Sequence, residues 1–132
     1  MATITLHQHS IRVYAEDVDF MGIVFHANYL RYLERSRTEM LRTNNLLLSD
    51  LIKLDILFAI RDLSIKYILP ARLDDLLITI TEIKEIRACT FVFIQTMRNQ
   101  HAQLICKAKI EVVCVDWNLK PKRLPNIIKQ VE

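Results

Sequence analysis

An acidic cluster stands directly before the only glycine of the chain. Glu16, Asp17 and Asp19 precede Gly22, and His26 follows where an amphipathic run begins. A carboxylate desolvated by apolar neighbours is suited to act as a base or a nucleophile. Backbone amides at the start of a helix stabilise negative charge that develops on a carbonyl oxygen. The segment therefore indicates acyl transfer, while acids near a helix start also have a structural explanation because they complement the helix dipole.

Gly22 adds a conformational requirement to this segment. The other predicted turns manage without glycine, so this position is expected to need a positive φ or the close approach of another group. Taken alone, an ordinary strand-to-helix turn explains it better. The apolar run from Ile23 to Phe25 is expected to enclose the site.

The elements that must position the segment follow from hydrophobic periodicity. Alternation over residues 4–13 predicts a strand running into Tyr14. Apolar residues at 29, 30, 33, 40 and 41 predict a helix of about four to five turns. Asn44 and Asn45 are expected to end it, since Asn tolerates the left-handed conformation. A second, short helix is predicted after Ser49 as its N-cap, and Pro125 is expected to open a short terminal helix.

The second half of the chain changes to a period of two. Residues 56–69, 74–86, 89–99 and 102–116 predict four strands in an antiparallel meander. In the last of them, apolar residues and residues 107, 109 and 111 occupy opposite faces. One helix covering a sheet of about five strands is an α+β architecture. Self-association is expected to protect its edge and outer face.

Bulk properties restrict the class of protein. A chain of 132 residues predicts one domain over 1–132, and 52% hydrophobic with 25% charged residues is globular composition. The net charge of +3 without a long basic run disfavours nucleic acid as a partner. Cys89, Cys106 and Cys114 form no CxxC pair, so no metal site or disulfide framework is predicted. The sequence has no signal peptide or apolar span, which predicts a cytoplasmic protein.

The string from Arg12 to Leu41 resembles the active-site segment of the tol-pal system-associated acyl-CoA thioesterases. It is more distantly similar to the 4-hydroxybenzoyl-CoA thioesterases, and both families belong to the hotdog superfamily. The similarity continues through residues 59–77, 89–95, 112–116 and 120–125, and so spans nearly the whole chain. The resemblance implies a hotdog fold and an acyl-CoA thioesterase that releases a free acid and coenzyme A. It also implies that no metal or redox cofactor is needed, and that the protein is a homodimer or homotetramer with active sites at the subunit interface.

The same resemblance implies roles for individual residues. Asp19 matches the catalytic carboxylate, as nucleophile or as general base for water. His26 matches the position whose backbone amide polarises the thioester carbonyl, and its imidazole is a second candidate for proton transfer. Tyr14 begins the motif and is expected to orient the acidic cluster through a hydrogen bond. Gly22 and Phe25 are expected to line the substrate, whereas Tyr29 is expected to be a packing residue.

Three positions depart from the family pattern. Val18 stands where Thr is common, Met21 where a small residue is common, and Phe25 where Tyr is common. These changes make the pocket more apolar and remove two hydroxyls. They bear on the hydrogen-bond network and the acyl preference more than on the reaction.

Basic residues offer candidate contacts for the phosphates of coenzyme A. Arg61, Arg72 and Arg87 are such candidates because a guanidinium presents planar donors that suit phosphate. Solvated strand ends explain the three arginines equally well. Lys120, Lys122 and Arg123 form a small basic group that is similarly ambiguous.

Two other functions compete with hydrolysis. The chain can be a binding module for acyl carrier protein or for an envelope complex, with incidental thioesterase activity, because its basic residues suit an acidic carrier protein. A hotdog dehydratase is disfavoured, since those sites resemble a different histidine motif that is absent here.

Overall fold

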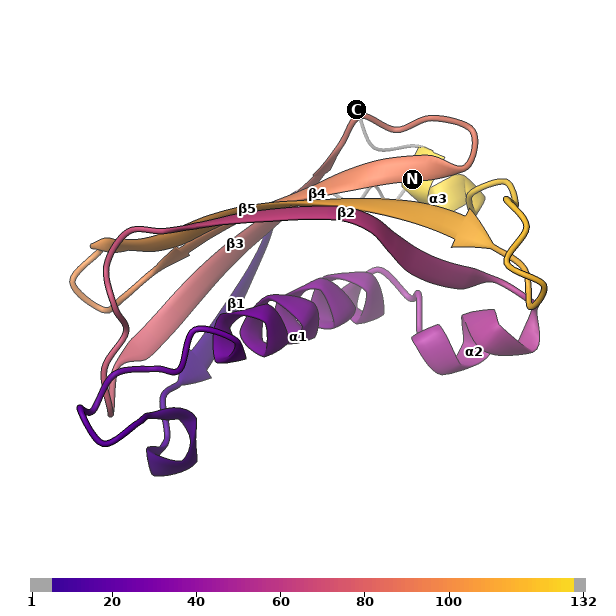
Figure 1. The fold of residues 1–132 in the computed structure, drawn as a ribbon. Helices are drawn as coiled ribbons and strands as arrows, with labels where there is room; N and C mark the ends of the chain where they lie inside the picture. Colours follow the sequence, from indigo (N-terminus) through magenta and orange to yellow (C-terminus); the bar gives the residue numbers. More distant parts are fainter. Residues whose placement is uncertain (1–5, 130–132) are drawn as a thin grey trace.

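One long helix lies along one face of a five-stranded antiparallel sheet (Figure 1). The computed structural model describes residues 6–129. Its elements are β1 (His7–Arg12), a 3-10 turn (Ala15–Asp17), α1 (Asn28–Thr43), α2 (Leu48–Lys53), β2 (Leu57–Tyr67), β3 (Leu76–Lys84), β4 (Thr90–Arg98), β5 (Leu104–Val115) and α3 (Asn126–Lys129). The predicted α+β hotdog fold is confirmed. Ile4, which was expected to begin the first strand, lies outside the described residues.

The strands are ordered β1-β3-β4-β5-β2. The predicted meander is correct for β3, β4 and β5 and wrong for β2. β1 pairs with the outer side of β3, the side that β2 would occupy in a meander, and Arg12 lies opposite Leu76. β2 therefore pairs with β5 at the far edge, where Tyr67 lies opposite Cys106. Residues 68–75 must then cross one end of the sheet, the end at which the acidic segment lies.

The helices follow the predicted pattern with one exception. Asn44 caps the C-terminus of α1, and Asn45 adopts the left-handed conformation with φ 63°. The prediction that Ser49 caps α2 is wrong, because α2 already begins at Leu48 and Leu47 occupies the cap with an extended backbone. α3 follows Pro125 as expected. None of the helices within residues 6–129 is long and apolar enough to cross a membrane.

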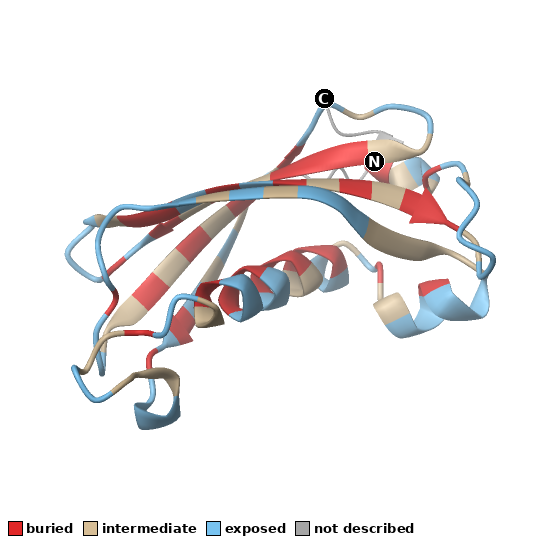
Figure 2. Cartoon of the chain, in the orientation of Figure 1, coloured by how far each residue is buried: buried red, intermediate tan, exposed pale blue. Residues whose placement is uncertain are grey.

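The core forms between α1 and the inner face of the sheet (Figure 2). Alternate residues of β3 are buried, among them Leu77 and Ile83, and the helix contributes Tyr32, Leu33 and Met40. The strand alternation predicted for β5 is confirmed by its buried and exposed positions.

The cysteine thiols fit a structural role. Cys106 and Cys114 are fully buried and Cys89 is half-buried. Burial raises the pKa of Cys106 to about 12. A thiol that ionises so reluctantly is a poor nucleophile near neutral pH.

Candidate active site

Residues 17–25 form a small hairpin that carries the acids on one arm. Val18 and Val24 form a bridge, the Asp19 amide donates to the Ile23 carbonyl at 3.0 Å, and the Phe25 amide donates to the Asp17 carbonyl at 3.2 Å. The turn of this hairpin contains Gly22, whose φ is 77°. A Cβ added there would meet no atom within 4 Å. The backbone conformation, and not a close approach, is therefore what favours glycine at this position.

The two aspartates of the cluster differ in what holds their carboxylates. Asp17 Oδ2 accepts the Tyr14 amide at 2.9 Å, which fixes the turn before the hairpin. Asp19 Oδ1 accepts the Met21 amide at 2.8 Å. Its second oxygen receives no hydrogen bond from the part of the chain that the structure describes. Asp19 is thus oriented by one oxygen and keeps the other available for chemistry.

The start of α1 presents backbone amides without acceptors. The His26 amide was expected to be such a donor, and the neighbouring Phe25 amide is already occupied by the Asp17 carbonyl. Among residues 6–129, no acceptor pairs with the amides of His26 and Ala27. Ala27 occupies the N-cap and has no side-chain oxygen to cap them. These two N–H groups, at the positive end of a sixteen-residue helix, suit an oxygen that gains negative charge.

Two tyrosines connect this helix start to the end of β2 and to the crossing segment 68–75. The Tyr67 hydroxyl at the end of β2 donates to the His26 carbonyl at 3.0 Å. The Tyr29 hydroxyl accepts the Ala71 amide at 2.9 Å, and the Val24 amide donates to the Ala71 carbonyl at 2.9 Å. The Tyr29 and Tyr67 rings meet edge to face, with centroids 5.3 Å apart. The crossing segment thereby holds both the hairpin and the start of α1.

Comparison with known proteins identifies the family. The model of the thioesterase-like superfamily matches residues 13–131. The chain belongs to the thioesterase-like superfamily. It is 42% identical over 125 residues to acyl-CoA thioester hydrolase YbgC of Escherichia coli, covering 94% of this chain and 93% of that protein. Acyl-CoA thioesterase YbgC of Haemophilus influenzae is also 42% identical, over 90% of this chain and 88% of the relative.

A solved structure of a probable thioesterase has a similar fold. A probable thioesterase from Bartonella henselae superposes with a TM-score of 0.83 at 33% identity, over 91% of this chain and 99% of that one. The family predicted from the segment between Arg12 and Leu41 is therefore confirmed.

Placed on this thioesterase-like chain, the predicted site residues separate into two groups. Asp19, Gly22, Phe25 and His26 come together on the hairpin and at the start of α1. Their roles stay predictions. Tyr14 lies next to the cluster, but its side chain is 60% exposed and its contact with Asp17 comes from its backbone amide.

The three predicted arginines lie apart from one another. Arg72 pairs with Ile23 next to the hairpin, and its amide donates to Asp75 Oδ2 at 2.9 Å. Arg61 stands at the bulge of β2, outside the regular register with β5. Arg87 lies in the turn between β3 and β4, at the end of the sheet opposite Asp19. Lys122 was also a candidate for phosphate binding. In the structure its ammonium donates to the backbone carbonyls of Leu54 and Asp55, both at 3.0 Å.

Apolar side chains near the hairpin are less enclosed than the sequence predicted. Val24 is buried, but Phe25 is 49% exposed. Phe20 and Met21, at the turn, are 98% and 61% exposed. Phe20, Met21 and Phe25 therefore expose apolar surface on the same hairpin that carries Asp19.

Tyr67 is a functional candidate that sequence reasoning missed, because nothing in an alternating strand marks the one hydroxyl that reaches the helix start. Its hydrogen bond polarises the peptide between His26 and Ala27 and so strengthens the Ala27 N–H as a donor.

We expect Tyr67→Phe to lower kcat roughly tenfold, because that factor corresponds to the free energy of about one hydrogen bond. KM and the thermal midpoint should change little, because the ring still packs against Tyr29. Steady-state kinetics with a melting curve checks this, and an unchanged kcat would argue against the positioning role.

Proposed function

We propose that this chain hydrolyses acyl-CoA thioesters to a free acid and coenzyme A. The proposal is supported by the YbgC relatives, which are named acyl-CoA thioesterases and match over almost their whole length. One observation carries the chemistry: the hairpin that leads into α1 holds the Asp19 carboxylate, and one oxygen of this carboxylate has no hydrogen-bond donor among residues 6–129. The His26 and Ala27 amides at the start of α1 have no acceptor within the same residues. These are the two groups that acyl transfer requires.

In this proposal the thioester carbonyl oxygen lies against the amides of His26 and Ala27. The electrophilic carbon then faces Asp19 on the opposite arm of the hairpin. Asp19 either attacks the carbon and forms an anhydride that water cleaves, or removes a proton from the water that attacks. In both routes the C–S bond breaks, the thiolate of coenzyme A leaves and takes up a proton, and the acid is released. The helix amides stabilise the oxyanion that both routes share.

A second copy of the chain completes the site in this proposal. Phe20, Met21 and Phe25 expose apolar surface on the hairpin that carries Asp19, and β2 is an edge strand of the sheet. Exposed apolar surface and an open strand edge are both removed from water when two copies associate. We expect a homodimer or a homotetramer in sedimentation velocity, and a fully active monomer would contradict the arrangement.

Thiol release from acyl-CoAs of graded length, with an aromatic member included, tests the activity directly. Release with at least one class supports hydrolysis. Tight binding of acyl carrier protein with no release from any acyl-CoA would instead favour the binding-module alternative.

A further inference from the structure

Arg37 is a buried cation that forms no ion pair within residues 6–129. It is 8% exposed, in the middle of α1. Its Nη1 donates to Gln95 Oε1 at 3.0 Å, and its guanidinium lies 5.9 Å from the centroid of the Phe93 ring. A guanidinium has five N–H donors, and the described residues provide an acceptor for one of them and an ion pair for none. A buried charge destabilises the folded protein unless hydrogen-bond acceptors or an opposite charge compensate for the lost hydration.

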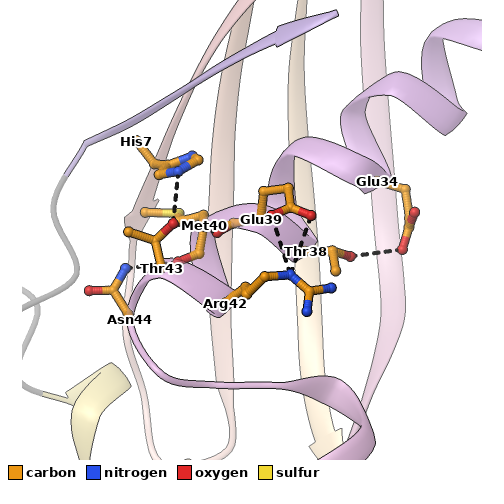
Figure 3. A network of polar contacts seen from close by, with 8 residues as sticks. All are labelled: His7, Glu34, Thr38, Glu39, Met40, Arg42, Thr43 and Asn44. Carbon is orange, nitrogen blue, oxygen red and sulfur yellow. Dashed lines mark hydrogen bonds and ion pairs between the residues drawn. The ribbon is translucent and has the colours of Figure 1, made fainter.

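The nearest acid on the same helix does not fill this role. Glu34 precedes Arg37 by about one turn, but its Oε1 accepts the Thr38 hydroxyl at 3.0 Å (Figure 3). Burial lowers the pKa of the Arg37 guanidinium, and Glu34 offsets this only in part. The remaining donors of Arg37 are therefore available to a group that comes from outside the chain.

Arg37 lies where two cavities between α1 and β2 meet. The larger, about 430 Å³, begins at Leu30 in the first turn of α1, and the smaller, about 130 Å³, ends at Leu48. Both are lined by Glu34, Arg37 and Ile60. We call this continuous space the α1–β2 groove. It is lined by Leu30, Arg31, Glu34, Arg35, Arg37, Thr38, Leu41, Leu48, Phe58, Ile60, Leu63, Phe93 and Val112.

The groove leads away from the proposed reaction centre. α1 and β2 run alongside it in opposite directions, with Tyr67 bonded to His26 at one end and Phe58 near Leu41 at the other. Arg37 is nine residues after the start of α1, or about 13 Å at 1.5 Å per residue. An extended chain of roughly eleven carbons spans this length, because a zigzag chain with bonds of about 1.5 Å advances by only about 1.25 Å per bond.

The chemistry of the groove changes along this length. Its walls are mainly apolar and suit a hydrocarbon chain, whereas Arg37 offers a planar fork that matches a carboxylate. Three arginines, at 31, 35 and 37, and one glutamate face it, so positive charge is in excess by two. Such a wall favours an anion over a neutral end group.

From this geometry we infer that the α1–β2 groove binds the acyl chain and that Arg37 recognises a carboxylate at its far end. The preferred substrates are then ω-carboxyacyl-CoAs of roughly ten to twelve carbons, by the helix length above. This inference rests on the proposed function, because it assigns the acyl group of the same reaction. Arg37 acts as a specificity-determining residue and takes no part in bond cleavage.

The test compares dodecanoyl-CoA with its ω-carboxy analogue of equal carbon number, and butyryl-CoA with succinyl-CoA as the short pair. We expect the wild-type protein to favour the long ω-carboxy substrate in kcat/KM by roughly 10- to 100-fold, as one charge-assisted contact provides. The short pair should show no such preference, because neither acyl chain reaches Arg37. Arg37→Met should abolish the long-chain preference. Arg42→Met is the matched control, since it removes an exposed arginine of the same helix outside the groove, and it should keep the preference.

Several results would overturn the inference. An equal rate on both long substrates in the wild-type protein would do so, as would a preference that survives in Arg37→Met. Loss of the dimer in Arg37→Met with an unchanged ratio would assign the charge to contacts between subunits instead. If Arg37→Met does not fold, Gln95→Glu places a carboxylate beside Arg37 and should reduce the preference toward one; an undiminished preference there contradicts the inference. Absence of hydrolysis with every acyl-CoA would refute the proposed function itself, and is thus a distinct outcome.

Discussion

Asp19→Asn is expected to reduce kcat for thioester hydrolysis by roughly 10³-fold or more, equivalent to about 4 kcal/mol of transition-state stabilisation. An amide cannot attack the thioester carbonyl or take the proton of water as a carboxylate does. The fold should be retained, because the side-chain oxygen of Asn still accepts the Met21 amide that Asp19 Oδ1 accepts now. Thiol release measured beside a thermal melt separates the two effects.

Asp17→Asn is the control for this substitution. Asp17 lies two residues before Asp19 in the same cluster, but its carboxylate accepts the Tyr14 amide and supports the turn. We expect this variant to keep most of its turnover. The assignment of the chemistry to Asp19 would be lost if the two variants exchanged these outcomes, or if Asp19→Asn retained wild-type turnover.

The largest expected effect on stability is at Gln95. This fully buried side chain accepts from Arg37, and its Nε2 donates to the Leu33 carbonyl at 2.9 Å and to Thr81 Oγ1 at 3.0 Å. Gln95→Leu keeps the approximate volume and leaves those three partners unsatisfied, with a charge among them. We expect a loss of about 3 to 5 kcal/mol in the free energy of unfolding, or roughly 10 to 20 °C in the thermal midpoint.

Gln8→Leu provides the matched comparison. Gln8 is exposed on β1, so the same change of side chain should alter stability by less than about 0.5 kcal/mol. Denaturant unfolding of the two variants at equal protein concentration checks the difference. Equal stability in both would mean that the polar network around Gln95 adds nothing to the core.

The local features of this chain were predictable because single residues determine them. Gly22 and Asn45 have positive φ, as expected from the conformations that these residue types tolerate. The long helix and the period-two strands likewise follow from patterns in adjacent residues. The edge position of β2 was not predictable this way, because it depends on the pairing of β1 with β3, two strands that lie far apart in the sequence.

The contacts that sequence reasoning missed all join distant parts of the chain. Tyr67 reaches His26 across 41 residues, and Arg37 reaches Gln95 across 58. In the sequence, each is an ordinary member of a strand or helix pattern. The placement of β2 and β4 against α1 gives Tyr67 a carbonyl to bind, and it sets Arg37 beside Gln95 with no carboxylate partner among the described residues.

The pairing of β1 with β3 has a consequence for biosynthesis. Arg12 Nη1 donates to the carbonyl of Asp74, 62 residues further along, and the Val13 amide donates to Asp75. β1 and the segment with Asp19 leave the ribosome early, while the strand that β1 joins is still to be translated. Non-local pairing of this kind delays folding until the later partner is available. We therefore expect nascent chains that stop before β3 to lack an ordered site and to expose an unpaired strand. A growing chain in this state is most prone to aggregate and most readily bound by chaperones.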